Sequence, residues 1–379
     1  MDEIQTESED GEKTEINGVL PVDRNYNWED YKLDEESVQD FVSPDNIEEQ
    51  IMAMIESRGV TGRYPRFTLS GPTGTAKTLA VRNIATQLDA PFFYIQGSDG
   101  LREEDMIGMP TYVGDQTWWS DGKCVKALLS SREQPTVLLL DEVNRAPERA
   151  KFVLFNMLDD RCELSIRPRS ETISGDPMNL IVFATMNEGE EYIVNGIDRA
   201  EKRRLGAKWE LNHLGLINPQ QEAELITNRT PIYYRLSLQM VKAANELRRM
   251  AQDKETVVDA GISNAIITDW ARTAYSLKDV EDDPLMTSCE KEILNQYYND
   301  NDRKYEVVRS TFESHVLSAP VLPEDADGYF GEVEENLHYE CSECAWKASQ
   351  SETSTFTKTF NDCPQCESRN TVRVTVAEQ

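Results

Sequence analysis

The chain has 379 residues, 39% of them hydrophobic, and carries a formal net charge of -30 from 69 acidic and 39 basic side chains. A single hydrophobic core usually stops growing at roughly 250 to 300 residues, so this length predicts more than one compact unit. The hydrophobic content excludes a largely disordered chain, the lack of about 18 consecutive apolar residues excludes a membrane-spanning helix, and the acidity disfavours broad binding to nucleic acid phosphates.

The acidic residues are spread along the whole chain, and arginine outnumbers lysine by 24 to 15. An acidic, lysine-poor surface is typical of proteins kept soluble in concentrated salt, where screening over about 3 Å at 1 M removes self-repulsion. We therefore predict a halophilic protein of a salt-rich cytoplasm, with an ordinary acidic protein as the alternative. The N-terminus, MDEIQTESEDGEKTE, lacks the basic and apolar stretches of a secretion signal, which favours a cytoplasmic location.

Strand and helix patterns alternate through the first half of the chain. Residues 1–20 are polar and aperiodic, which predicts a disordered acidic leader. Apolar residues between 38 and 55 follow helical spacing, which predicts one or two helices before the first core strand. Strands are then predicted at 66–70, 91–96, 136–140, 180–186 and 207–211, with helices at 77–88 and 150–158. This alternation predicts an α/β fold with a parallel sheet and helices on both faces.

The second half has no comparable strand pattern. Helical periodicity dominates from 219 to about 312, and a stretch rich in Pro, Asp, Glu and Gly follows. We therefore divide the chain into a leader at 1–20, an α/β core at 21–212, a helical lid at 213–318, a linker at 319–335 and a small terminal module at 336–379.

A phosphate-binding pattern follows the first predicted strand and opens the next helix. It consists of Gly71, Pro72, Thr73, Gly74, Thr75, Ala76, Lys77 and Thr78. In such a loop the lysine reaches the β- and γ-phosphates of ATP, and the final hydroxyl ligates Mg²⁺. Ala76 stands where the pattern has glycine, and we expect this position to begin the helix with φ near about -60°, where a methyl group is tolerated.

Two more strand ends complete the predicted site. The apolar strand at 136–140 leads into Asp141 and Glu142, and ligands of parallel sheets bind at such carboxyl ends. We expect Asp141 to hold Mg²⁺ and Glu142 to activate water as a general base. Asn187 ends the strand that follows and is expected to orient that water and sense the γ-phosphate. A solvated turn for the carboxylates and a helix cap for Asn187 are the alternatives.

The region from about 38 to 212 resembles the MoxR-like and dynein-related branch of P-loop AAA+ ATPases, which includes GvpN- and CbbQ-type proteins. The resemblance is carried by GPTGTAKT, by residues 104–108 and 121–128, by LLLDEVNRAP and by ATMN. It implies a homo-oligomeric ring, usually a hexamer, with ATP bound between subunits and a partner protein as the client. It also implies an arginine that contacts the γ-phosphate of a neighbouring subunit.

Arg203 and Arg204 occupy the segment where that arginine is expected, and Arg199 is the less favoured candidate. A solvated helix face is the alternative for all three. The second sensing arginine of the family has no match, because residues 263–265 read Ser-Asn-Ala and Arg272 lies further along.

Two hairpins are predicted within the core, one over 111–122 that contains Trp118 and Trp119, and one that pairs 163–166 with 171–174. The first resembles the hairpin that this branch inserts into a core helix. Its tryptophans either contact a partner from an exposed position or pack locally, and the residues favour neither alternative.

The terminal module carries a candidate metal centre. Cys341 and Cys344 form one C-x-x-C pair, and Cys363 and Cys366 form another after eighteen intervening residues. This spacing predicts a structural Cys₄ zinc ribbon, with iron as the rival metal. A module this small has little core, so metal binding of about 10 to 16 kcal/mol would be coupled to its folding.

The sequence therefore favours an ATP-hydrolysing, chaperone-like remodeller of a partner protein. A nucleic-acid-handling factor whose ribbon contacts DNA or RNA is one alternative, although the net charge of -30 opposes it. A nucleotide-binding scaffold that hydrolyses ATP weakly is another, because Ala76 and the missing second sensor depart from the family pattern.

Overall fold

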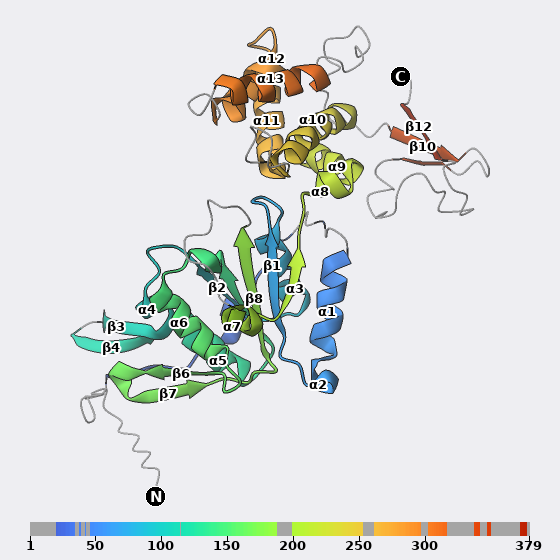
Figure 1. Ribbon diagram of the computed structural model, residues 1–379. Helices are drawn as coiled ribbons and strands as arrows, with labels where there is room; N and C mark the ends of the chain where they lie inside the picture. The colour runs from blue at the N-terminus through green and yellow to red at the C-terminus, as the bar shows by residue number, and fades with distance from the viewer. Residues whose placement is uncertain are drawn as a thin grey trace, which may run out of the picture. The chain divides into compact units, whose positions relative to one another are not determined.

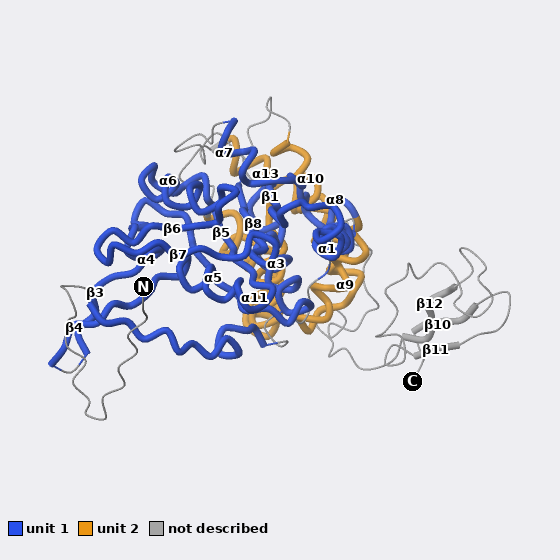
Figure 2. The backbone as a smooth tube through the Cα atoms, turned by 90° about the horizontal axis from the view of Figure 1, so that it is seen from below, with its two compact units in different colours: residues 1–217 blue, residues 218–379 orange. Residues whose placement is uncertain are grey.

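The computed structural model describes residues 20–34, 38, 42, 46–113, 115–187, 199–252, 261–296, 302–316, 337–341, 347–349 and 372–376. The chain divides into two compact units, residues 1–217 and 218–379 (Figure 2). This division lies close to the boundary expected between core and lid at 212 and 213. The predicted leader up to residue 19 and the predicted linker at 319–335 lie outside the described residues.

A five-stranded parallel sheet forms the centre of the first unit, with strand order β2-β5-β8-β1-β9 (Figure 1). The strands are β1 (Arg66–Gly71), β2 (Phe92–Gln96), β5 (Thr136–Asp141), β8 (Leu180–Asn187) and β9 (Ala207–Glu210). The five strands predicted from the sequence, and their parallel arrangement, are confirmed.

Both faces of this sheet are covered by helices, because its central strands are apolar on both sides. On β5, Val137 and Leu139 pack in one core with α1 (Ile47–Glu56) and α3 (Lys77–Gln87). The alternate residues Leu138 and Leu140 pack in the opposite core with α5 (Lys123–Ser131) and α6 (Glu148–Met157). The prediction of helices on both faces is therefore confirmed.

Two antiparallel hairpins are added to this core. They are β3 (Gly108–Val113) with β4 (Gln116–Asp121), and β6 (Glu163–Ile166) with β7 (Glu171–Ser174). The first unit also contains short helices: η1 (Trp28–Tyr31), α2 (Arg58–Thr61), α4 (Glu103–Ile107), η4 (Val143–Arg145), η5 (Arg167–Arg169), α7 (Arg199–Arg204) and α8 (Leu214–Ile217).

The described residues of the second unit up to 316 are mainly helical. Its elements are α9 (Pro219–Arg229), α10 (Tyr234–Gln252), α11 (Asn264–Leu277), α12 (Pro284–Glu292), η7 (Leu294–Gln296) and α13 (Asp302–Val316). Their apolar faces form one core, in which the rings of Trp270 and Phe312 meet edge to face at 5.0 Å. A fully buried ion pair crosses this core, with Arg248 Nη1 2.6 Å from Glu222 Oε2.

A three-stranded antiparallel sheet follows, in the order β11-β10-β12. Its strands are β10 (Leu337–Cys341), β11 (Lys347–Ser349) and β12 (Val372–Val376). Across the described parts of both units, no helix is long and apolar enough to cross a bilayer.

Candidate nucleotide-binding site

The carboxyl ends of neighbouring strands bring the predicted nucleotide residues together. β1 pairs with β8 so that Gly71, the first residue of the phosphate loop, lies beside Asn187. β5 pairs with β8 on the other side, and it ends at the same edge of the sheet with Asp141 followed by Glu142. Because all three strands are parallel, the loop, the carboxylates and the amide meet where ligands of such sheets bind.

The phosphate loop is compact, and glycine is required at its entrance. Gly71 has φ 143°, and a Cβ at this residue would lie 2.1 Å from the carbonyl oxygen of Leu211. Gly74 also lies in the left-handed region, with φ 79°. Inside the loop, the Thr75 hydroxyl donates a hydrogen bond to the Pro72 carbonyl at 3.0 Å. This hydrogen bond and the two positive-φ glycines hold the loop in a tight turn before α3 begins.

Ala76 does not adopt the conformation expected from the sequence. The sequence predicts a φ of about -60°, the value of a first helical residue. Ala76 is instead the N-cap residue of α3 and lies in the left-handed region, with φ 60° and ψ 25°. The expectation was wrong because the chain must reverse its direction between the loop and the helix. The family pattern places glycine at this position, and here an alanine adopts a conformation that glycine adopts without strain.

Lys77 fills the loop with its ammonium group. The Nζ atom donates to the carbonyl oxygens of Gly71 at 2.9 Å and Pro72 at 2.7 Å, and the side chain is buried. An ammonium has three donors and no acceptor, so these carbonyls satisfy most of its hydrogen-bonding capacity. The lysine ammonium is therefore held inside the loop, the place expected of a phosphate ligand.

Asp141 is fixed by three hydroxyl groups. Its Oδ1 accepts hydrogen bonds from Thr78 Oγ1 at 3.0 Å and from Thr185 Oγ1, and its Oδ2 accepts one from the Tyr94 hydroxyl at 3.1 Å. Burial and the charge of Asp141 raise the pKa of Tyr94 to about 12, so this phenol remains protonated and donates its hydrogen. The Thr78 hydroxyl and the Asp141 carboxylate thus place two oxygens of the type that Mg²⁺ prefers next to each other.

Glu142 is held by an amide and a guanidinium group. Asn187 Nδ2 donates to its Oε1 at 2.6 Å, and Arg145 Nη1 contacts its Oε2 at 2.7 Å. The backbone of Glu142 is left-handed, with φ 50° and ψ 42°, in the turn between β5 and η4. The residues predicted as general base and water-orienting amide are therefore in direct contact.

The family model for the AAA domain of the dynein-related subfamily matches residues 66–205. Residues 66–205 are therefore similar to an AAA domain of that subfamily. The matched region contains the phosphate loop, both carboxylates, Asn187 and the three candidate arginines.

Characterised relatives align with this AAA domain. The denitrification regulatory protein NirQ of Stutzerimonas stutzeri is 27% identical over 56% of this chain and 72% of its own length. NorQ of Paracoccus denitrificans is 27% identical over 52% of this chain and 69% of its own length. The chaperone MoxR1 of Mycobacterium tuberculosis is 29% identical over 49% of this chain and 44% of its own length. These relatives support the predicted resemblance to the MoxR-like branch.

Among solved structures, the RuvB Holliday junction branch migration motor of Thermotoga maritima superposes with a TM-score of 0.40 at 17% identity. The superposition covers 79% of this chain and 87% of that one.

The candidate arginines of the AAA domain lie on α7, outside the cluster of strand ends. Arg203 is exposed, and Arg204 is 35% exposed with its Nε 3.9 Å from Asp159 Oδ1. Arg199 begins the same helix and is exposed. In the second unit, Arg272 is exposed and pairs with Asp269 at 3.3 Å, and we assign it no sensing role.

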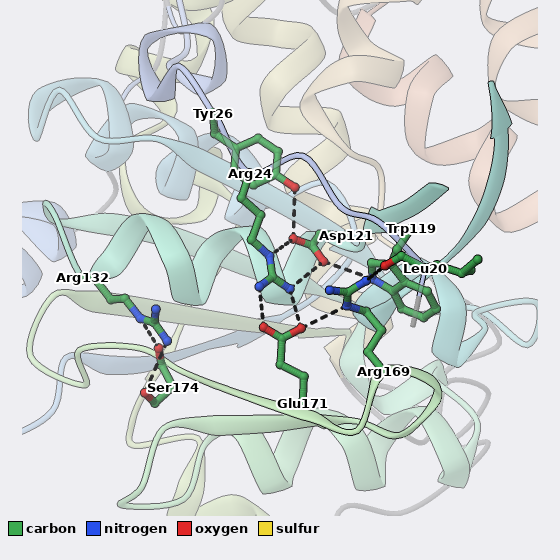
Figure 3. Close-up of polar contacts among 9 residues, drawn as sticks. All are labelled: Leu20, Arg24, Tyr26, Trp119, Asp121, Arg132, Arg169, Glu171 and Ser174. Atoms are coloured by element: carbon green, nitrogen blue, oxygen red, sulfur yellow. Dashed lines mark hydrogen bonds and ion pairs between the residues drawn. The ribbon is translucent and has the colours of Figure 1, made fainter. Parts of the chain in front are cut away.

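An N-terminal segment, residues 20–34, ties the two hairpins of the AAA domain together (Figure 3). Arg24 contacts Asp121 of β4 through Nε at 2.8 Å and Glu171 of β7 through Nη1 at 2.5 Å. The Tyr26 hydroxyl also donates to Asp121 at 3.1 Å, and Arg169 contacts Glu171 at 3.0 Å. Local sequence could not predict this network, because its members are separated by up to 147 positions.

The two tryptophans of the first hairpin differ in how deeply they are buried. Local packing holds for Trp119, which is 4% exposed and donates from Nε1 to Asp121 at 3.1 Å, while Trp118 is half-buried. The strongly exposed apolar side chains of this hairpin are instead Tyr112 at 71% and Val113 at 60%. A partner at this hairpin would therefore meet β3 rather than the buried Trp119.

Sequence reasoning missed four residues of the site. Thr185 and Tyr94 bind Asp141, Arg145 binds Glu142, and Gly97 leaves room for the turn, because a Cβ there would lie 2.2 Å from the Glu142 carbonyl oxygen. Thr185 carried a signal: it is a polar residue within a buried apolar strand, and such a group requires a hydrogen-bonding partner.

The predicted metal centre falls mainly outside the described residues. Cys341 ends β10, whereas Cys344, Cys363 and Cys366 lie in ranges that are not described. Within the described ranges no cluster of three potential ligands is found. Cys124, Cys162 and Cys289 are buried, and burial raises the pKa of each thiol.

Proposed function

We propose that this AAA+ protein binds ATP with Mg²⁺ and hydrolyses it at the edge of the sheet where β1, β5 and β8 end. The observation that carries the proposal is the convergence of a lysine-filled loop, two carboxylates and an amide at one site. Bound ATP with Mg²⁺ supplies a γ-phosphoryl group for attack and a cation that neutralises its charge.

The residues at this site suit those tasks. Lys77 places a buried ammonium inside the loop, where it can exchange the carbonyls of Gly71 and Pro72 for phosphate oxygens. Thr78 and Asp141 supply oxygen ligands for the cation. Glu142 accepts the proton of the attacking water, and its contact with Asn187 fixes the direction of its carboxylate.

Two substitutions test this site, because they remove different functions. Lys77→Ala is expected to abolish ATP binding, whereas Glu142→Gln is expected to retain binding and stop phosphate release. Nucleotide affinity and steady-state phosphate release are measured for both variants and wild type in concentrated KCl. Near-wild-type turnover in both variants contradicts the assignment. Tight binding with very slow turnover in the wild type would indicate the weakly hydrolysing scaffold.

We further propose that the active form is a hexameric ring in which α7 of one subunit completes the site of its neighbour. The exposure of Arg203 and the weakly contacted position of Arg204 support this, because both guanidinium groups are accessible for a second chain. An arginine that contacts the γ-phosphate from a neighbouring subunit contributes about 10³ to 10⁵ in rate.

Mixed oligomers test the shared site. Arg204→Ala and Arg203→Ala are each expected to lose turnover and retain ATP affinity. Mixing Arg204→Ala with Lys77→Ala should restore part of the activity, since one subunit supplies the loop and the other supplies the arginine. Mixing Lys77→Ala with Glu142→Gln is the matched control and should restore none, because every site lacks a residue of its own chain. A monomer that turns over ATP normally contradicts the ring.

The client of the ring is proposed to be a protein. The Glu142→Gln variant retains ATP and should therefore retain its client, which a pull-down against Lys77→Ala as the control would identify. Stimulation of turnover by DNA or RNA, without such a client, would favour the nucleic-acid alternative.

The C-terminal module is proposed to bind one structural zinc ion through its four cysteines. The first C-x-x-C pair lies where β10 ends and before β11 begins, a position that suits a metal-binding turn between two strands. Metal analysis should find one zinc per chain, or iron if that rival is correct. Cys341→Ser and Cys363→Ser should lose it. Deleting residues after 335 should leave basal ATP turnover unchanged, and its collapse would contradict this role.

We also propose that the protein functions in a salt-rich cytoplasm, because its net charge of -30 is screened there. The thermal midpoint should rise steeply between low and molar KCl. A midpoint independent of salt would contradict the proposal.

A further inference from the structure

One hydroxyl group joins the two carboxylate residues of the site. Thr185 is fully buried on β8, where the neighbouring Ala184 lies beside Leu140 of β5. Its Oγ1 donates a hydrogen bond to Asp141 Oδ1 and accepts one from the backbone N–H of Glu142 at 2.9 Å. A threonine hydroxyl has one donor and two acceptor positions, so both hydrogen bonds form at the same time.

The first of these bonds orients the Asp141 carboxylate, whose two other hydroxyl partners are Thr78 and Tyr94. Thr78 also donates to Asp141 Oδ1, at 3.0 Å, but Thr78 is itself a candidate ligand of the cation. When the Thr78 oxygen ligates Mg²⁺, Thr185 on Oδ1 and Tyr94 on Oδ2 remain to hold the carboxylate. Thr185 therefore fixes the oxygen that faces Thr78.

The second bond fixes the turn that carries the general base. Glu142 has φ 50° and ψ 42°, a left-handed conformation that costs a non-glycine residue about 1 to 2 kcal/mol and persists only where its surroundings impose it. Thr185 holds the N–H of this residue from β8. On the other side, Gly97 donates its N–H to the Asp141 carbonyl at 2.6 Å and approaches so closely that a Cβ would clash.

We propose that Thr185 is a positioning residue for ATP hydrolysis. Through one oxygen atom it sets both the carboxylate that holds the cation and the backbone turn from which Glu142 reaches the water. Its hydroxyl bonds to Asp141 and to the Glu142 N–H, so it acts through these two residues. The assignment rests on the proposed hydrolysis at this site and adds to it a residue outside the phosphate loop and the two carboxylates.

The test compares variants that differ by single groups. Thr185→Val keeps the branched shape and removes the hydroxyl, which leaves the Glu142 N–H without its partner. Thr185→Ser keeps the hydroxyl and removes a methyl group. Tyr94→Phe removes a hydrogen bond to Asp141 and leaves the Glu142 turn intact. For each variant, ATP affinity without Mg²⁺, kcat and the Mg²⁺ concentration for half-maximal turnover are measured.

Thr185→Val is expected to lower kcat on the order of 10²-fold, the effect of misplacing reacting groups by about 1 Å. It should also raise the Mg²⁺ requirement, while metal-free ATP affinity stays close to wild type because Lys77 and the loop are unchanged. Thr185→Ser should recover most of the lost kcat. Tyr94→Phe should raise the Mg²⁺ requirement and, at saturating Mg²⁺, lose much less kcat than Thr185→Val.

Two results overturn the assignment: wild-type kcat and Mg²⁺ dependence in Thr185→Val, or a Thr185→Ser variant as slow as Thr185→Val. Thr185→Ala is measured alongside, so that a second hydroxyl-free variant is available if the valine variant does not fold. A wild type that binds ATP and releases no phosphate refutes the proposed function itself. Wild-type turnover with unchanged valine and alanine variants refutes only the role of Thr185.

Discussion

Replacing Ala76 with glycine should stabilise the nucleotide-free protein. Ala76 has φ 60° and ψ 25° at the N-cap of α3, and a left-handed conformation costs an alanine about 1 to 2 kcal/mol relative to glycine. Glycine loses more conformational freedom on folding, which offsets about 0.4 to 1 kcal/mol of that gain. The free energy of unfolding should therefore rise by up to about 1.6 kcal/mol, with a central value of about 0.8 kcal/mol.

The assay is urea and thermal unfolding of the purified protein without nucleotide, followed by tryptophan fluorescence. For a unit of this size, 1 kcal/mol corresponds to a shift of about 2 to 4 °C in Tm. Ala85→Gly is the matched control, because Ala85 lies inside α3 and is buried. There the same change should destabilise the protein by about 1 kcal/mol. Equal destabilisation by both substitutions would refute the conformational argument for Ala76.

Two further substitutions test the packing of each unit. Arg248→Met leaves the carboxylate of Glu222 buried without its bidentate partner, so the free energy of unfolding of the lid should fall by about 3 to 5 kcal/mol; a loss below about 1 kcal/mol contradicts this. Arg24→Met removes the contacts to Asp121 and Glu171 and should destabilise the core by about 2 kcal/mol, with increased proteolysis of the two hairpins. Because hydrogen bonds from Arg24 lower the pKa of Glu171, this contribution is complete above the ordinary glutamate pKa of about 4.5 and is lost as the pH falls through the lowered value. An Arg24 variant with wild-type stability at neutral pH would refute that role.

The sheet could be predicted because its strands are short apolar runs bounded by turn residues, and because strands and helices alternate. The nucleotide residues could be predicted because they follow those runs directly. Asp141 ends β5 and Glu142 follows it, whereas Lys77 begins α3 after the loop that follows β1. The parallel sheet brings these strand ends to one edge. For these residues, local sequence and the geometry of a parallel sheet together determine the location.

Other features depend on contacts that local sequence does not encode. The left-handed conformation of Ala76 and Glu142 follows from chain reversals rather than from residue preference. The burial of Trp119 depends on the segment at 20–34, which lies nearly a hundred positions earlier in the chain. The backbone N–H of Trp119 donates to the Pro21 carbonyl at 2.7 Å. The role of Thr185 follows from strand register, because pairing with β5 places its hydroxyl beside Asp141.

The most direct measurement of the central claim is the identity of the nucleotide that remains bound after incubation with ATP and Mg²⁺. Wild-type protein is mixed with ATP below the protein concentration, quenched in acid after several minutes and analysed by chromatography, with Glu142→Gln treated identically. We predict ADP from the wild type and intact ATP from the Glu142→Gln variant, because only the first carries a carboxylate that accepts the proton of the attacking water. Intact ATP from both proteins, or ADP from both at equal rates, would contradict hydrolysis by Glu142 at this site.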